Sequence, residues 1–352
     1  MGDCLMSTLN VATVNATTTL NTSSINGGQL AGFRNRIING GFDVWQRGTS
    51  FSPVANGQVY TADRFFMNRN GVSEWTVARQ GTSEQYSCRV QRNAGTTSTQ
   101  PMRVRQVLES ADCAGIVGKT VTFSCEIKVG ANFSAAAGHV TLTISQGTGI
   151  DESSTKMATG FTGVVNTGSN KVPTTSFEKY SVTTPVIGAT ISQLGVLIEA
   201  TPVGTAGADD WYEIRNLQLE VGSTATEFEQ RPIGTELALC QRYLPAYNAD
   251  SASGKTIALG QNYATTNAMI VFPFVVEPRV PPTGISISAA GDFRVTAAVA
   301  TALGVTGLSF SNASRKAAQI NATVASGLVA GDATRFHSLS AAAKILFTGC
   351  EL

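Results

Sequence analysis

The sequence predicts an all-β protein with an antiparallel β-sandwich followed by a second, C-terminal β-sandwich. Charged residues make up only 14% of the chain, against a usual share of about 25%; Ser, Thr, Asn, Gln and Gly supply the polarity instead. Short runs rich in Val, Ile, Thr and Phe alternate with polar residues, as strands do. Glycine-containing turns separate these runs, and few stretches show a helical period.

Four segments follow one another along the 352 residues. They are an N-terminal extended leader (1–32), a β-sandwich (33–231), a short connector helix (232–250) and a C-terminal β-rich domain (251–352). The leader has few apolar residues, so it is either disordered or ordered by docking on a partner chain. We favour docking, because solvated tails usually carry more charge. Both Met1 and Met6 are candidate translation starts.

A period of two marks the strands of the first sandwich, most clearly at residues 120–129. Every second position there is apolar: Val121, Phe123, Cys125, Ile127 and Val129. Residues 139–147 repeat the pattern, and 193–200 and 211–221 add two more strands. In the last of these the apolar phase slips, which predicts a bulge near Arg215 that restores one buried face. Many short strands without intervening helices indicate a sandwich.

Residues 232–247 give the clearest helix signal. Pro232 and Thr235 stand at its start, and Pro245 ends it. One face of this helix carries three apolar residues: Leu237, Cys240 and Leu244. A single short helix in this place is expected to connect two β units.

The C-terminal segment begins with a run, residues 268–276, that is apolar in both phases, so we expect a strand covered on both sides. Further short strands are expected around Phe293, Leu308–Phe310, Ile320 and Ile345–Phe347. About 100 residues suffice for a small sandwich. Low charge and many Ala, Val and Thr residues indicate that part of its surface is buried against identical chains.

Charge and hydropathy argue against several classes of protein. The net charge is +1 and no basic block is present, so we expect no nucleic-acid partner. No apolar stretch reaches about 18 residues, so we expect no membrane insertion, and the first residues do not resemble a secretory signal. The six cysteines form no CxxC pair, which indicates free, mostly buried thiols in a protein made in a reducing cytosol.

Catalytic and metal-binding motifs are largely missing. The stretch ADSASGKT (249–256) ends like a phosphate-binding loop, but Ala249 stands where that motif needs glycine. His139 and His337 are the two histidines, and neither has a metal-ligand partner at motif spacing. We place His337 in a helical or loop segment and expect both histidines to be surface or packed residues rather than ligands or bases.

Asp209 and Asp210 are the nearest approach to a catalytic pair. Glycosidases need two carboxyl groups about 5–10 Å apart across a cleft, whereas adjacent strand residues point to opposite faces. We expect a solvated turn here, with a calcium ligand as the alternative. No GxSxG elbow and no Ser-His-Asp set appears. The sequence therefore predicts that the protein is not an enzyme.

Trp45, Arg47 and Trp75 are the candidate glycan-binding residues, because exposed indoles stack on sugar rings and arginine binds their hydroxyl groups. The competing interpretation is core packing, since an indole buries a large apolar area, and we favour packing for both tryptophans. Trp45 would then lie in the first strand of the sandwich, after a turn at residues 39–41. Two structural ion pairs are also expected: Arg47 and Arg64 with Asp43 and Asp63.

Two longer stretches resemble bacteriophage proteins. They are NGGFDVWQRGTSF…YTADRFF at 39–66 and WYEIRNLQLEVGSTATEFEQRPIGTELALCQRYL at 211–244, of which the second is the more specific. Both are similar to tail-fibre-like and other virion structural proteins of phages, including phages of cyanobacteria and marine bacteria. The resemblance covers about residues 33–247.

This resemblance implies a virion protein assembled in the host cytoplasm, foremost a homotrimeric tail fibre or similar appendage that binds a host surface glycan. It implies that residues 1–32 contact other virion proteins and that residues 250–352 form a distal tip. One alternative is a capsid decoration protein (a cement or head-fibre protein) of the same build. The other is a polysaccharide depolymerase, whose carboxylate pair would lie in a groove, for example between subunits.

The same region is also similar to divergent carbohydrate-binding jelly rolls, which implies that the first sandwich is a jelly roll. In those modules an NGxFE…W strand opens the sandwich and a DD(V/I)xLE strand closes it beside a structural calcium. Four residues match the opening: Asn39, Gly40, Phe42 and Asp43. Arg215 and Asn216 stand where acidic residues are usual. The resemblance implies Asp43 and Asn216 as ligands of a structural calcium, and no other cofactor.

Overall fold

The computed structural model describes residues 33–52, 57–69, 75–249, 254–297 and 302–352. The leader 1–32, for which the sequence predicts docking, lies outside the described residues, as do residues 250–253 of the phosphate-loop-like stretch. Strands account for 46% and helices for 8% of the structure, which confirms the prediction of an all-β protein. Within the described ranges, no helix is long and apolar enough to cross a membrane.

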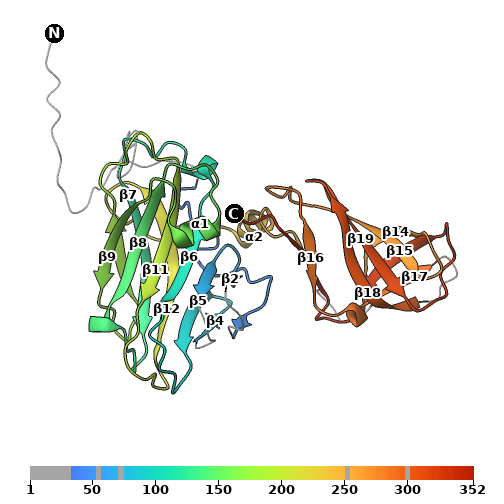
Figure 1. Ribbon diagram of the computed structural model, residues 1–352, viewed down its shortest axis with the longest axis horizontal. Coiled ribbons are helices and arrows are strands. Elements are labelled where there is room, and N and C mark those ends of the chain that lie inside the picture. Colours follow the sequence, from blue (N-terminus) through green and yellow to red (C-terminus); the bar gives the residue numbers. More distant parts are fainter. Residues whose placement is uncertain (1–32, 53–56, 70–74, 250–253, 298–301) are drawn as a thin grey trace, which may run out of the picture.

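Two antiparallel six-stranded sheets form the first unit and pack face to face (left in Figure 1). Sheet I has the order β1 (Ser50–Phe51), β4 (Trp75–Thr82), β5 (Gln85–Arg92), β12 (Trp211–Val221), β7 (Val121–Val129), β10 (Glu178–Thr183). Sheet II has the order β2 (Gly57–Tyr60), β3 (Phe66–Arg69), β6 (Met102–Val107), β11 (Gln193–Ala200), β8 (Val140–Gly147), β9 (Val165–Lys171). The chain crosses between the sheets after β1, β3, β5, β6, β7, β9, β10 and β11, which is the wrapping of a jelly roll.

A hydrophobic core fills the space between the two sheets, because the strands turn their apolar positions inward. The side chains of β7 show this most clearly: Val121, Phe123, Cys125 and Ile127 are at most 1% exposed. The predicted period of two is therefore the period of burial.

The predicted bulge in β12 is confirmed. The register of β12 with β7 shifts between Arg215 and Gln218, and Asn216 has a φ of 54°. Because of this extra residue, Ile214 and Leu217 both face the core although they lie on opposite phases of the strand.

The segment that precedes β1 is not a strand, which corrects the prediction for Trp45. Asn39 and Phe42 have φ values of 62° and 57°, so the chain turns sharply there instead of extending. The first strand, β1, begins only at Ser50. The Trp45 ring still packs in the core beside Phe42, and its indole nitrogen donates a hydrogen bond to the Phe42 carbonyl at 2.6 Å. The predicted core packing of Trp45 is confirmed.

Gly40 allows this turn to lie directly against β12. A Cβ atom on Gly40 would sit 2.1 Å from the Leu217 carbonyl oxygen, whereas one on Gly41 would meet the Asp43 carboxylate at 2.7 Å. A flexible side chain can move aside, but a paired backbone carbonyl cannot. We therefore expect Gly40→Ala to lower the free energy of unfolding by about 1–3 kcal/mol and Gly41→Ala by about 0.5 kcal/mol. Urea denaturation of the two variants measures both losses, and equal losses would contradict this packing argument.

The connector helix α2 (Ile233–Gln241) is shorter than predicted. Cys240 lies in a small apolar cluster with Ile38, Val44 and Tyr243, so the helix packs on the first unit. Leu237, expected on the buried face, is 37% exposed. The prediction for Leu237 is wrong because only one narrow side of this two-turn helix is covered.

The second unit consists of a closed barrel and a small sheet (right in Figure 1). The barrel order is β14 (Thr256–Asn262), β15 (Asn267–Pro273), β19 (Ala317–Val324), β18 (Ala302–Ala313), β17 (Phe293–Ala297), β20 (Ala333–Ser338). The small sheet has the order β13 (Ala246–Asn248), β21 (Lys344–Thr348), β16 (Gly284–Ile287). The C-terminal strands thus form a barrel rather than two open sheets, because β14 pairs with both β15 and β20 and leaves no edge.

Two expectations for the barrel are corrected. The strand β15 is not covered on both sides, because Ile270 is buried while Val271 is 44% exposed. His337 lies in a strand, β20, rather than in a helix or loop. It is packed, with its Nδ1 atom 3.3 Å from the Gly254 carbonyl oxygen. Four short helices complete the fold: η1 (Ser110–Cys113), η2 (Ala136–Gly138), α1 (Ser154–Thr159) and η3 (Ala290–Asp292).

Buried thiols agree with the prediction from the cysteine pattern. Five cysteines are free and buried: Cys88, Cys113, Cys125, Cys240 and Cys350. Cys4 lies outside the described residues.

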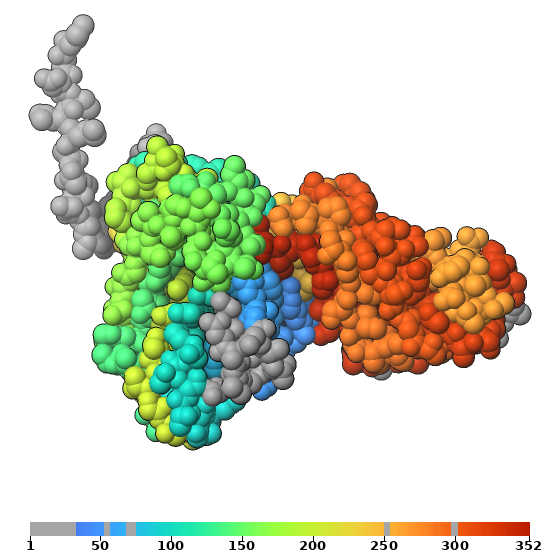
Figure 2. All heavy atoms as spheres, viewed as in Figure 1, coloured from blue at the N-terminus to red at the C-terminus, as the bar shows by residue number. Residues whose placement is uncertain are grey.

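The last residues of the chain return to the first unit, so the C-terminus lies beside α2 between the two units (Figure 1). Leu352 packs with Phe66 and Met157, and its carbonyl oxygen accepts a hydrogen bond from the Tyr60 hydroxyl at 3.0 Å. Glu351 forms ion pairs with the guanidinium groups of Arg47 and Arg64. The space-filling view shows the two units in contact around these residues (Figure 2).

Candidate functional site

The candidate glycan-binding tryptophans lie inside the jelly roll. Trp45 is 8% and Trp75 4% exposed, and both belong to the core between the sheets. Stacking on a sugar requires a ring face that is open to solvent, so neither indole is placed for that role in this structure.

Arg47, Arg64 and Asp63, three residues of the expected ion pairs, lie where the C-terminal residues pack on the jelly roll. Arg47 binds Asp63 at 3.1 Å and Glu351 at 3.0 Å. Arg64 pairs with Glu351 rather than with an aspartate. Burial is the largest influence on Asp63 and raises the pKa of its carboxyl group to about 6. The sequence could not reveal Glu351 as the shared partner, because it lies about 300 residues from Arg47 and Arg64.

Asp43 and Asn216, the candidate calcium ligands, have separate surroundings. The Asn216 side-chain nitrogen donates a hydrogen bond to Glu126 at 2.7 Å. Asp43 is half-buried, and this burial raises the pKa of its carboxyl group. Across the described ranges, no group of three or more His, Cys, Asp and Glu side chains is placed to hold a metal ion.

Asp210 corrects the expectation of a solvated turn. Its side chain is 0% exposed and pairs with Arg92, itself 1% exposed, at 2.8 Å. Asp210 also accepts hydrogen bonds from the backbone nitrogen and the hydroxyl group of Ser134. Asp209 is exposed as expected. The two carboxylates therefore do not share a cleft, and Asp210 is a structural anchor.

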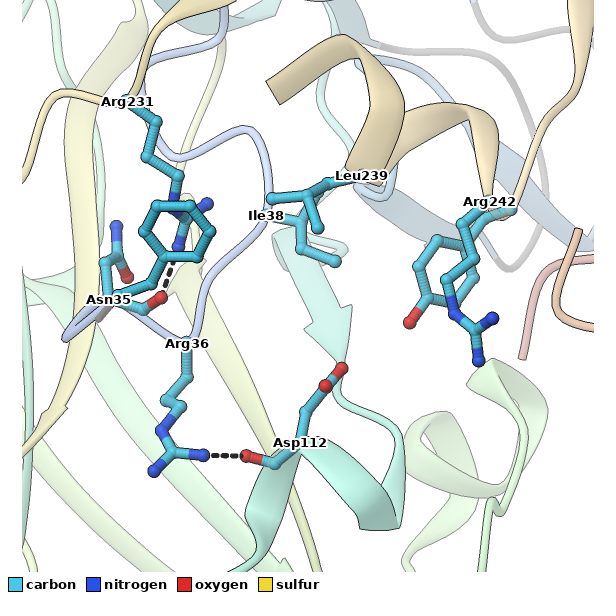
Figure 3. A pocket seen from close by; sticks show the side chains of 9 residues that line it. Asn35, Arg36, Ile38, Asp112, Arg231, Leu239 and Arg242 are labelled. Carbon is cyan, nitrogen blue, oxygen red and sulfur yellow. Dashed lines mark hydrogen bonds between the residues drawn. The ribbon is translucent and has the colours of Figure 1, made fainter. Parts of the chain in front are cut away.

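A small cavity of about 190 Å³ lies between the segment 33–38, η1 and α2 (Figure 3). Its arginines are already occupied: Arg36 donates to the Asp112 carbonyl oxygen, Arg231 to the Asn35 carbonyl oxygen, and Arg242 to Glu109. These bonds hold the segment 33–38 and the helix on the jelly roll. The arginines of this cavity therefore have a structural role.

A larger groove, with a volume of about 430 Å³, lies on the outer face of sheet II. Its floor follows from the strand register, which places Gly168, Thr143, Leu197 and Arg105 in one row across β9, β8, β11 and β6. The next row contains Asn166, Ser145 and Gly195. We name this depression the sheet II groove.

One wall of the sheet II groove is the segment formed by α1 and the residues that follow it, and α1 lies beside β6 in Figure 1. Met157 of this helix covers Gly195, where a Cβ atom would be 2.8 Å from the methionine sulfur. Ser153 begins the helix and accepts a hydrogen bond from the Lys156 backbone nitrogen. Phe161 packs with Met157 and Leu352, so the chain end also supports this wall.

The polar side chains that the strands contribute to the floor of the sheet II groove are unengaged. Among the described residues, no hydrogen bond is formed by the side chains of Thr143, Ser145 or Asn166. Arg105 is 4% exposed, and its Nε and Nη1 atoms are buried without a hydrogen-bond acceptor in the described structure. Burial, together with the nearby Arg103, lowers the pKa of Arg105 to about 10, so the guanidinium stays charged at neutral pH.

Hydroxyl, amide and guanidinium groups on a concave sheet face can bind the hydroxyl groups of a saccharide. The sequence analysis missed these residues, although the alternation of Met102, Arg103, Val104 and Arg105 is a period-two signal that places both arginines on one face. No pattern in the sequence indicates that Arg103 is paired with Glu199 while Arg105 is left without a partner.

No protein-family pattern and no curated protein matches this chain. Solved structures with some likeness include the enzymatically active domain of tailspike protein 4 of bacteriophage CBA120, at 11% identity and a TM-score of 0.32, covering 53% of this chain and 21% of that chain. A CBM4 module matches at 15% identity and a TM-score of 0.30, covering 52% of this chain and 97% of that chain. The CBM22-1 xylan-binding domain of Paenibacillus barcinonensis Xyn10C matches at 14% identity and a TM-score of 0.31, covering 57% of this chain and 100% of that chain.

The prediction that the protein is not an enzyme is overturned by this comparison. Besides the enzymatically active tailspike domain, the similar structures include a cyclase from Fischerella sp. TAU and the α-L-arabinofuranosidase MgGH51. The missing catalytic motifs therefore do not exclude an enzyme. With TM-scores near 0.3, the likeness assigns neither an activity nor a ligand to this chain.

Proposed function

We propose that this chain is a phage virion protein whose jelly roll binds a host surface glycan in the sheet II groove. The observation that carries the glycan-binding part is the groove itself. Three strands of sheet II, β6, β8 and β9, present unengaged hydroxyl, amide and guanidinium groups on one open sheet face. Saccharides are recognised by such convergent polar groups in a concave site.

The virion part of the proposal rests on the sequence stretches at 39–66 and 211–244. We place the protein in a tail fibre or similar appendage, as a homotrimer attached to other virion proteins through residues 1–32. Exposed apolar side chains on the barrel support self-association: Leu259 and Val271 are direct cross-strand partners, 65% and 44% exposed. Light scattering that finds a monomer in dilute solution would count against the trimer.

Location in the particle is tested by immunogold labelling of intact virions with an antibody against residues 254–352. Gold on the tail appendages supports the fibre. Gold spread over the head would instead support a capsid decoration protein.

Glycan binding is tested with variants of the groove floor. We expect Thr143→Val and Asn166→Ala each to weaken the binding of host polysaccharide fragments about fivefold, because each removes one neutral hydrogen bond worth about 1 kcal/mol. The matched control is Ser181→Ala, a hydroxyl on the outer face of sheet I beside the core residue Val182. Isothermal titration calorimetry measures the three affinities. Equal affinity for all three variants and the unchanged protein would contradict the groove as the site.

Incubation of the protein with host polysaccharide also tests for enzymatic activity. New reducing ends in the polysaccharide would identify a depolymerase, and their loss in the Asn166→Ala variant would place the cleavage in this groove.

A further inference from the structure

Arg105 is the one feature of the sheet II groove that the binding of a neutral sugar does not explain. Its side chain is almost fully buried, yet two of its three nitrogens have no acceptor among the described residues. A buried guanidinium without a counter-ion costs several kcal/mol, and a buried donor without an acceptor costs about 1–3 kcal/mol. A ligand in the groove that places an anion at the third nitrogen, Nη2, would compensate this charge.

The neighbouring charges do not supply it. Glu199 stands one row away on the outer face and is already paired with Arg103. No aspartate or glutamate lines the sheet II groove. A charge of +1 therefore remains uncompensated at the groove floor, in a place where low exposure strengthens its interaction with an anion.

The groove also leaves room for a ligand next to Arg105. At Gly168, in the same row, a Cβ atom would stand 3.2 Å from the Thr143 hydroxyl oxygen. The missing side chain keeps that hydroxyl accessible, and Asn166 adds an exposed amide beside it. The row therefore offers one charged donor at one end and neutral hydrogen-bonding groups at the other.

We propose that the sheet II groove selects acidic glycans, and that Arg105 binds the carboxylate or sulfate group of one sugar residue. This inference rests on the proposed glycan binding and names its substrate class. Guanidinium groups bind such planar or tetrahedral oxyanions through charge-assisted hydrogen bonds, and here Nη2 would be the donor. Thr143, Ser145 and Asn166 would bind the hydroxyl groups of the same or the next sugar.

The test follows the Arg105 Nε–H resonance of the full-length protein by NMR during titration at constant ionic strength. The probes are sodium glucuronate, glucose 6-sulfate, methyl glucuronate and glucose; Arg105→Met assigns the resonance. We expect one or both acids to move this resonance and to bind at least about tenfold more tightly than the uncharged ester, as hydrogen bonds to charged groups do. Whichever acid produces the effect identifies the anionic group.

Arg103→Met is the matched control, because Arg103 lies two residues away on the same face but is paired with Glu199. It should keep the preference for the acid, whereas Arg105→Met should lose it. If Arg105 is held only for the ligand, Arg105→Met should also raise the melting temperature by about 2–4 °C, since it removes a buried charge. A lower melting temperature would show that Arg105 stabilises the fold, and would overturn the inference.

The remaining outcomes separate this inference from the proposed function. If glucose and the ester move the amides of Ser145 and Asn166 as strongly as the acids do, the groove binds neutral glycans and only the acidic preference falls. If no probe moves any groove resonance and host polysaccharide fragments do not bind, both proposals fall together.

Discussion

Replacing Asp210 by asparagine should lower the free energy of unfolding by about 3–5 kcal/mol, which is the usual effect of removing one partner of a buried ion pair. Asp210 and Arg92 are 0% and 1% exposed, and their side chains meet at 2.8 Å. Arg92 also donates to the carbonyl oxygens of Thr96, Ser98 and Gly204. The pair therefore joins the end of β5 and the start of β12 to the loops at one end of the jelly roll.

The adjacent carboxylate provides the control for this variant. Asp209 is exposed, so Asp209→Asn should change the stability by about 0.5 kcal/mol or less. Guanidinium chloride denaturation of the two variants distinguishes the positions. Similar small losses would show that water reaches Arg92 and that the pair is not buried in solution.

Replacing Glu351 by glutamine should lower the free energy of unfolding by a similar amount, about 3–5 kcal/mol, although Glu351 stands far from the jelly roll in the sequence. Its carboxylate serves Arg47 and Arg64 together, and the Arg64 side chain is only 2% exposed. Without this carboxylate, Arg64 would stay charged between the jelly roll and the ring of Tyr243, which lies 3.5 Å from the guanidinium carbon. Thermal unfolding should show a lower transition for the jelly roll.

Glu277 is the matched control for Glu351, because it also pairs with two basic residues, Arg315 and Lys316. Its side chain is 38% exposed, and ion pairs that are open to solvent contribute little to stability. Glu277→Gln should therefore leave the unfolding curve almost unchanged. If both variants lose the same stability, the junction is open to solvent and the central role of Glu351 is wrong.

Much of the fold could be predicted from local patterns. The alternation in β7 predicts its buried face, and the phase slip in β12 predicts the bulge near Arg215, because both follow from the two-residue period of a strand. The place of Trp45 in irregular backbone could not be predicted, since it depends on left-handed turns at Asn39 and Phe42 that residue types other than glycine seldom adopt. Closure of the C-terminal strands into a barrel depends on long-range pairings, of which that between β14 and β20 spans the most residues.

Less of the candidate site could be predicted from the sequence. Tryptophans suggest sugar stacking, but Trp45 and Trp75 are used in the core. Arg105 carries no motif, and its significance depends on which carboxylates are absent around it. The strand register across β6, β11, β8 and β9 brings together residues more than 60 positions apart. A single sequence gives no direct information about such pairings.

The return of the chain end to the jelly roll has a consequence for synthesis on the ribosome. Residues 33–244 emerge before the barrel, but Glu351 and Leu352 follow only after the whole barrel has been translated. Until then, Arg64 lacks its carboxylate, and Phe66, Met157 and Phe161 lack the leucine that packs with them. The jelly roll is thus completed only after the barrel has been translated, and a nascent chain stalled within the barrel would expose an unfinished surface to chaperones and proteases.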